Sequence, residues 1–236
     1  MDKSGPSTGA PALHAVIFDL DGVLVSTDQL HFRAWKALAD SLALPFDENT
    51  NHHLRGVSRE ESLRTVYRLA GRPLPASAEL AAQCSEKNRH YLNLVSQMTP
   101  ADILPGASAL INALRFLGIK IAVASASKNA RVVLEQTQLA PRIHAIVDGN
   151  DVPESKPDPR VFLVAAARLN IPPFRCVGVE DAATGIEAIR RAGMPSIGVG
   201  PAATSADIHA PSTADLSPKL LFRALRLHQS SDRISV

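Results

Sequence analysis

The sequence has little cysteine, no long apolar run and no excess of charge of one sign. Its two cysteines, Cys84 and Cys176, lie far apart without metal-ligand spacing, which argues against a disulfide framework and favours a reducing, cytoplasmic compartment. No apolar stretch approaches the roughly 18 residues that span a membrane. The formal net charge is only +2, with both signs mixed along the chain, so we expect neither nucleic acid nor a membrane as a partner.

The first residues also lack a targeting signal. Residues 1–12 are rich in Ser, Gly, Pro and Thr and contain no apolar h-region, so we expect a flexible leader rather than a signal peptide. A length of 236 residues is enough for one large domain or one domain with an insert. We expect the protein to be a monomer.

Short apolar runs alternate with amphipathic stretches along most of the chain. Strands are predicted at Ala15–Leu20, Ile119–Ala124, Ala145–Asp148, Cys176–Val179 and Ser196–Val199. Helices are predicted at Ala107–Leu117, Ala130–Gln138, Arg160–Leu169, Thr184–Ala192 and Leu216–His228. Fully apolar strands that alternate with helices favour the α/β class, with a Rossmann-like parallel sheet covered on both faces. In such sheets ligands bind beyond the carboxyl ends of the strands.

Residues 28–99 interrupt this alternation. Their helical patterns cover Asp28–Leu42, Glu60–Ala70, Ala76–Asn88 and His90–Gln97, without a convincing strand. We therefore predict a helical cap domain at 28–99, inserted after the first strand of a core domain made of 13–27 and 100–236. The two links are expected to lie side by side as a hinge, with Thr27 or Ser26 capping the first helix.

An acidic motif, Phe18-Asp19-Leu20-Asp21-Gly22, directly follows the first apolar run. Side chains at i and i+2 of extended chain share a face, so Asp19 and Asp21 are expected to converge on one site. Gly22 allows a sharp turn after them. Two carboxylates this close repel each other, and a hard cation is the usual remedy. The alternative is a solvated turn after a strand.

Further polar residues follow other predicted strands: Ser125, Lys156, Glu180 and Asp181. Because the strands are predicted to be parallel, these loops should open at one edge of the sheet. A divalent cation beside a phosphoryl group would suit that combination of hydroxyl, ammonium and carboxylates. Taken singly, Ser125 could instead cap a helix, Lys156 could be a surface lysine, and the acidic pair could complement a helix dipole.

Together these motifs resemble the haloacid dehalogenase-like superfamily of phosphoryl-transfer enzymes. The resemblance implies that Asp19 is the nucleophile that forms an aspartyl phosphate and that Asp21 is the general acid and base. It implies that Ser125 and Lys156 hold the phosphoryl oxygens. It also implies a Mg²⁺ ion bound by Asp19, the main-chain carbonyl of Asp21, Asp181 and, directly or through water, Glu180.

Within that superfamily, His31–Leu38, Leu54–Glu60 and Ser125–Asn129 resemble the β-phosphoglucomutase family. The resemblance implies conversion of β-glucose 1-phosphate to glucose 6-phosphate through β-glucose 1,6-bisphosphate, with Arg59 gripping the distal phosphate. The substrate-site residues that it implies are Thr27, His31, Trp35, Arg55, Gly56, Val57, Ser58, Arg59, Lys87, Ser127, Lys128 and Asn129. Ser26 departs from the acidic residue that many relatives carry before the hinge threonine.

Two other functions stay open at this point. A sugar-phosphate phosphatase would share every core motif, because loose closure of the cap would let water attack the aspartyl phosphate. A non-catalytic phosphosugar-binding protein would keep the pocket but lose the nucleophile, which the intact Asp19 argues against. In the cap, His31 and Trp35 could simply pack together, and Arg55 and Arg59 could be solvated loop cations.

Overall fold

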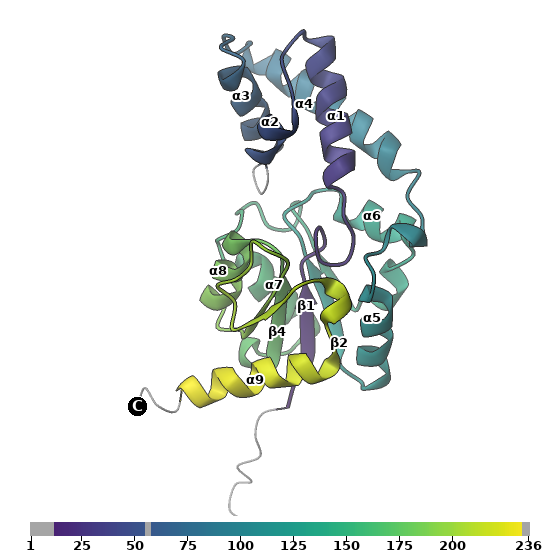
Figure 1. Cartoon of the computed structure of the whole chain (residues 1–236), viewed down its shortest axis with the longest axis vertical. Helices are drawn as coiled ribbons and strands as arrows, with labels where there is room; N and C mark the ends of the chain where they lie inside the picture. Colours follow the sequence, from purple (N-terminus) through teal and green to yellow (C-terminus); the bar gives the residue numbers. More distant parts are fainter. Residues whose placement is uncertain (1–11, 55–57, 233–236) are drawn as a thin grey trace, which may run out of the picture.

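A six-stranded parallel sheet forms the centre of the protein (Figure 1). The computed structural model describes residues 12–54 and 58–232, apart from the side chains of residues 229–232. The strand order is β3-β2-β1-β4-β5-β6. The strands are β1 (Ala15–Phe18), β2 (Lys120–Ala124), β3 (Ala145–Val147), β4 (Cys176–Glu180), β5 (Ser196–Val199) and β6 (Ile208–Ala210). The predicted α/β class with a parallel sheet is confirmed.

Helices cover both faces of this sheet, and β1 shows why its residues are apolar throughout. Val16 and Phe18 pack into the cluster beneath α5, α6 and α9, whereas Ala15 and Ile17 face the opposite cluster beneath α7 and α8. A strand buried on both faces reads as a continuous apolar run. The covering helices are α5 (Ala107–Phe116), α6 (Ala130–Gln136), α7 (Arg160–Leu169), α8 (Ala183–Arg191) and α9 (Pro218–Asp232).

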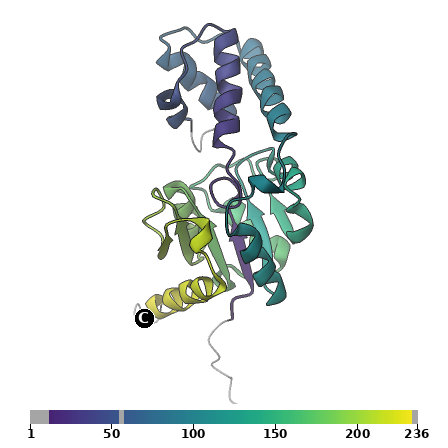
Figure 2. The same cartoon turned by 45° about the vertical axis from the view of Figure 1, so that its right-hand side comes forward.

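Four helices stand apart from the sheet, beyond the carboxyl ends of its strands (Figures 1 and 2). They are α1 (Asp28–Ser41), α2 (Glu48–His52), α3 (Arg59–Leu69) and α4 (Ser77–Val95). Trp35, Leu63, Val66 and Leu80 belong to a buried apolar cluster of these helices that is distinct from the two sheet clusters. This segment therefore has apolar packing of its own, while Tyr91 and Val95 at the end of α4 join the cluster of the sheet.

Three local predictions differ from the structure. The patterns at Ala76–Asn88 and His90–Gln97 form one continuous helix, α4, because Arg89 between them is an ordinary helix former and not a break. Helix α2 and strand β6 were not predicted, since five residues are too short to show a helical period and His209 interrupts the apolar pattern of β6. Thr27 occupies the N-cap position of α1 but makes no side-chain cap bond.

The chain enters and leaves the helices α1–α4 at neighbouring points. Val25 forms an antiparallel bridge with Ile103, and the amide of Leu104 donates to the carbonyl of Leu24 at 2.9 Å. The two links thus lie side by side, as expected for an insertion. Among the described residues, no helix has both the length and the apolar character required to cross a membrane.

Candidate active site

The acidic motif lies where β1 ends, at the edge of the sheet that faces α1–α4 (Figure 1). The amide of Asp19 still pairs with the carbonyl of Val179 on β4, which fixes its position beside that strand. Gly22 adopts a φ of +79°, and a Cβ there would overlap the carboxylate of Asp181. Glycine therefore supplies both the turn and the space for a second acidic segment to approach.

Lys156 joins two of the carboxylates in this site. Its ammonium contacts the Asp19 carboxylate and lies 2.6 Å from Oε2 of Glu180, in a largely buried setting. The other oxygen of Glu180, Oε1, accepts from the amides of Asp181 and Ala182 at 3.3 Å. Lys156 is thus a buried, paired cation and not a solvated surface lysine.

Negative charge exceeds positive charge at this point. Burial raises the pKa of Asp19 to about 7, with a further contribution from the neighbouring Glu180 and opposition from Lys156. Burial followed by repulsion from Asp19 raises the pKa of Asp181 to about 6. Burial alone would lower the pKa of Lys156, but the carboxylates of Asp19 and Glu180 outweigh it and raise that pKa. One ammonium therefore does not neutralise three carboxyl groups.

The donor set of this cluster fits a hard divalent cation. Asp19, Glu180 and Asp181 each offer a carboxylate oxygen within 4.8 Å of the others. Carboxylate oxygens are the ligands that Mg²⁺ and Ca²⁺ prefer, and a second positive charge would relieve the repulsion that raises the pKa values. Gly185 helps to shape this side of the site, because a Cβ there would overlap the carboxylate of Glu180.

The second aspartate of the motif is directed elsewhere. Oδ1 of Asp21 accepts from the amide of Thr27 at 2.7 Å, and Oδ2 accepts from the Thr27 hydroxyl at 2.6 Å. Its side chain is absent from the carboxylate cluster formed by the described residues. Burial raises its pKa to about 6 against the lowering effect of these bonds. The Asp21 carboxylate is thus held by Thr27, close enough for its charge to interact with those of Asp19 and Asp181.

A cationic site lies within the helices α1–α4. Lys87 is 2% exposed, its ammonium lies 2.8 Å from Nδ1 of His31, and it stands 4.9 Å from the ring centres of Trp35 and Tyr91. His31 stacks on Tyr91 with 4.2 Å between ring centres. Burial, with a contribution from Arg59, lowers the pKa of Lys87 to about 7. The face of the Trp35 ring thus contacts the Lys87 ammonium.

The start of α3 carries the other predicted cap residues. Arg59 is half-buried, and burial lowers its pKa. Its charge also acts on Lys87 and His31, which places these three basic groups near one another. Ser58 is the N-cap of α3 and accepts from the amide of Glu61 at 3.3 Å. The predicted substrate residues Arg55, Gly56 and Val57 lie outside the described residues.

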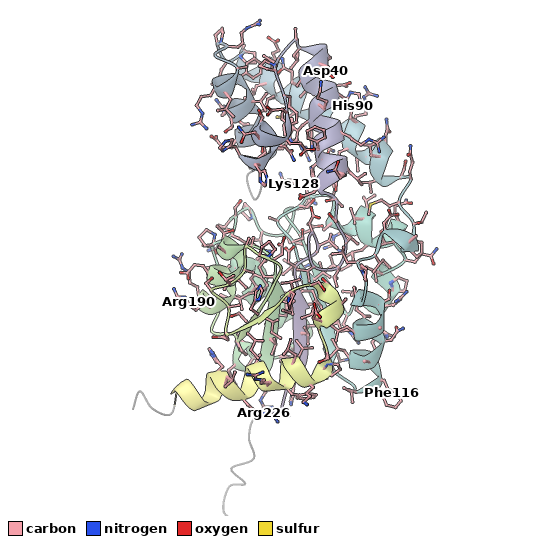
Figure 3. All side chains as sticks on the ribbon, viewed as in Figure 1. Asp40, His90, Phe116, Lys128, Arg190 and Arg226 are labelled. Atoms are coloured by element: carbon pink, nitrogen blue, oxygen red, sulfur yellow. The ribbon has the colours of Figure 1, made fainter. Side chains whose placement is uncertain are left out.

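The loop after β2 holds the remaining predicted residues. Oγ of Ser125 accepts from the amide of Ser127 at 3.1 Å, and Oγ of Ser127 accepts from the amide of Asn129 at 3.2 Å. Helix α6 takes Asn129 as its N-cap, so the idea that Ser125 caps that helix is wrong. Lys128 is exposed and lies between the sheet and the helices α1–α4 (Figure 3).

Sequence reasoning missed Tyr91, Asn88 and Gly185 as parts of this region. The Tyr91 hydroxyl contacts the side chain of Thr27, which in turn holds Asp21. The side chain of Asn88 bonds to Asn129. Tyr91 and Asn88 lie on one helix face near Lys87, and four-residue spacing from Lys87 was the only signal that could have found Tyr91.

Comparison with known proteins agrees with this geometry. The model of the haloacid dehalogenase-like hydrolases matches residues 13–193. The chain belongs to the haloacid dehalogenase-like hydrolase family, as the motifs at the strand ends predicted.

Within the family, the chain is similar to β-phosphoglucomutases. It is 43% identical to the β-phosphoglucomutase of Bacillus subtilis over 212 residues, which cover 89% of this chain and 94% of the relative. The crystal structure of β-phosphoglucomutase from Clostridium difficile superposes with a TM-score of 0.86 at 35% identity, covering 92% of this chain and 99% of that one. A phosphorylated carbohydrates phosphatase of Thermotoga maritima is 30% identical over 78% of this chain and 84% of its own.

Proposed function

We propose that this protein is a β-phosphoglucomutase, which interconverts β-D-glucose 1-phosphate and D-glucose 6-phosphate through an aspartyl phosphate and β-glucose 1,6-bisphosphate. The observation that carries this proposal is the presence of two separate cationic sites. Lys156 lies beside Asp19 in the core, whereas Lys87 and Arg59 lie in the helices α1–α4. An enzyme that moves a phosphoryl group between the two ends of a sugar needs a grip for each phosphate.

In this proposal the core residues carry the chemistry. Phosphorylated Asp19 gives its phosphoryl group to the 6-hydroxyl oxygen of the sugar, and the hydroxyl proton passes to Asp21. After the bisphosphate has turned over, Asp19 takes the 1-phosphoryl group and Asp21 returns the proton to the oxygen on C1. The Ser125 hydroxyl and the Lys156 ammonium donate hydrogen bonds to the oxygens in transfer.

The carboxylate cluster would hold Mg²⁺ through Asp19, Glu180, Asp181 and the main-chain carbonyl of Asp21. When bound, the ion would offset the repulsion between the Asp19 carboxylate and the anionic phosphate. The close grouping of three carboxyl oxygens and their raised pKa values support this assignment.

Asp21 would change partners during the reaction. Its two oxygens are occupied by Thr27, which follows the turn after β1 and precedes α1. To accept a proton from the sugar, the carboxylate must leave Thr27 and turn toward Asp19. Its pKa of about 6 suits a group that both accepts and donates a proton near neutral pH.

Residues 28–99 would form a cap domain over a core made of 13–27 and 100–236. The separate apolar cluster of the helices α1–α4 supports that division. The cap would exclude water from phosphorylated Asp19 and bring the second phosphate grip, with the predicted Arg55–Val57 segment, onto the substrate.

We also infer a monomeric, cytoplasmic protein whose partners are small sugar phosphates. The two cysteines are free thiols in the structure, which suits a reducing compartment. A monomer suits the carboxylate cluster, because its three members come from one chain.

The test is a product analysis. The protein is incubated with Mg²⁺, β-glucose 1-phosphate and a trace of glucose 1,6-bisphosphate, and glucose 6-phosphate and free phosphate are followed together. Glucose 6-phosphate with little free phosphate supports the mutase. Mainly free phosphate contradicts it and indicates a phosphatase, and binding without either product indicates a phosphosugar-binding protein.

A further inference from the structure

Asn129 stands at the N-cap position of α6 but does not cap the helix. Its backbone has φ −105° and ψ 8°, and no side-chain cap bond is formed. Instead, the side-chain nitrogen of Asn129, Nδ2, donates to Oδ1 of Asn88 on α4 at 2.9 Å. Asparagine is among the most favourable N-cap residues, so α6 forgoes a stabilising bond in favour of a contact with a distant helix.

The main chain around Asn129 does not need this contact. The hydroxyls of Ser125 and Ser127 accept from the amides of Ser127 and Asn129. On the other side of the loop, Nδ2 of Asn150 donates to the carbonyl of Lys128 at 2.9 Å. These bonds fix the loop from within the core, and what the Asn88 contact adds is the orientation of one side-chain amide.

That orientation matters for a ligand. A primary amide nitrogen carries two N–H groups, and Asn88 takes one of them. The second N–H is then directed by the bond that the first one makes. Asn88 follows Lys87 directly on α4, so the same helix turn carries the basic site of the helices and the contact with the core loop.

We propose that Asn88 is a positioning residue that orients the Asn129 amide for a phosphate or sugar oxygen and sets α4 in register with the loop after β2. This inference rests on the proposed function of that loop as part of the substrate site. In this proposal the Asn88 contact fixes the distance between the Lys87 ammonium and the Asn129 side chain.

The test compares two variants with a matched control. Asn88→Ala removes the acceptor, and Asn88→Leu removes it while keeping the volume of the side chain. Asn93→Ala makes the same chemical change on the same helix, at an exposed position outside the site. Each protein is assayed with β-glucose 1-phosphate, Mg²⁺ and a trace of bisphosphate, and its melting temperature is recorded.

Both Asn88 variants should raise KM by about three- to ten-fold, the effect of one lost hydrogen bond, with kcat changed less. Asn93→Ala should stay within about two-fold of the wild type in both constants. In an Asn129→Ala background, Asn88→Ala should add almost nothing, because the two residues act through one bond.

Independent, multiplying effects of Asn88→Ala and Asn129→Ala would overturn the proposal, as would Asn88 variants that behave like Asn93→Ala. If Asn88→Ala does not fold, the Asn88→Leu series decides in the same way. Release of free phosphate by the wild type would reject the mutase but not this inference, because KM for hydrolysis reports the same contact. If neither product forms, the affinity for glucose 6-phosphate measured by calorimetry replaces KM.

Discussion

At the scale of single residues, Lys87 illustrates a conflict between stability and the proposed function. Its ammonium is buried, and the titratable groups that act on it include His31 on α1, Arg59 on α3 and Cys84 on its own helix. Nδ1 of His31 and the ring faces of Trp35 and Tyr91 favour the charged form, but among the described residues no carboxylate pairs with it. An ammonium without a carboxylate partner is expensive to bury, and such groups are typical of sites that await an anion.

We expect Lys87→Met to raise the free energy of unfolding and to lower the enzymatic activity. The pKa of Lys87 is lowered from 10.5 to about 7, so the unfolded chain binds more protons between these values. The wild-type free energy of unfolding should therefore rise with pH from about 7 to 10.5, a slope that the variant should lack. At pH 7 the variant should be more stable by on the order of 2 kcal/mol.

Denaturant unfolding at several pH values, with kinetics in parallel, checks this prediction. The activity should fall by about ten-fold or more, since a charge-assisted bond to substrate is lost. Equal pH slopes for the two proteins would show that Lys87 keeps its ordinary pKa in the folded state.

Asp19→Asn should abolish turnover to either product without unfolding the protein. The amide keeps the shape of the side chain and removes both the nucleophilic oxygen and a charge that is repelled by Glu180. We expect a loss of at least about a thousand-fold in kcat, at a melting temperature within a few degrees of the wild type. Asp40→Asn, at an exposed ion pair with Lys36, is the matched control and should keep full activity.

The residues at the strand ends could be predicted because strand polarity alone brings them to one edge of a parallel sheet. Asp19, Lys156, Glu180 and Asp181 meet there in the structure. The direction of a side chain depends instead on contacts with distant residues, which strand polarity does not determine. Asp21 bonds to Thr27 because the turn at Gly22 brings the start of α1 within reach, which no i, i+2 rule contains.

At the scale of elements, the loop after β2 depends on the loop after β3. Arg131 on α6 forms ion pairs with Asp148 at 3.0 Å and Asp151 at 2.9 Å, and Arg168 on α7 also binds Asp151. The contact with Asp148 is an ion pair without a hydrogen bond to that buried oxygen. These charges pull the two loops together, and Gly149 leaves room for the main chain of Ala126.

We expect Arg131→Ala to destabilise the protein by about 1–3 kcal/mol, because the buried carboxylate of Asp148 loses its countercharge. Because the amide of Gly149, in the loop after β3, donates to the carbonyl of Ser127, KM for the substrate should rise as well. Arg190→Ala, at an exposed pair with Glu187, should change stability by less than about 0.5 kcal/mol. Urea unfolding of the wild type and the two variants provides the measurement. Equal midpoints for both variants would contradict a stabilising role of the Arg131 ion pairs.

Element prediction succeeded where the local pattern alone was clear. Helix α7 and strand β5 begin and end at the predicted residues. The short β6 pairs with β5, and Asp207, just before β6, accepts from the amide and hydroxyl of Ser196 at the start of β5. This long-range contact leaves no local pattern in the sequence. The helices α1–α4 lie over the strand ends because they follow the carboxyl end of β1, and this point of insertion could be predicted from the sequence.

At the scale of the whole molecule, a cation in the carboxylate cluster should act as a stabilising ligand. Asp19 and Asp181 have raised pKa values of about 7 and about 6, so the stability that they give to the metal-free protein is present at low pH and is lost as the pH rises through these values. A bound Mg²⁺ ion reverses that loss, because it favours the ionised carboxylates.

Saturating Mg²⁺ should therefore raise the melting temperature, by more at pH 8 than at pH 5. At a hundred times the dissociation constant the gain in stability is about 2.7 kcal/mol. Asp181→Asn should remove most of this effect, whereas Asp40→Asn should keep it. Calorimetric melts with and without EDTA at both pH values decide the matter, and an equal rise for all three proteins would point to binding elsewhere.

The pairing of Val25 with Ile103 also bears on how the chain folds. Strand β1 pairs with β2, although residues 19–119 separate them, so forming this pair early would close a long loop at a considerable entropic cost. Once the helices α1–α4 have assembled and Val25 pairs with Ile103, the segments that still separate the two strands are only 19–24 and 104–119. We therefore expect early assembly of these helices to shorten the loop that the β1–β2 pair must close, so sequence changes that slow their assembly should delay the sheet beneath them.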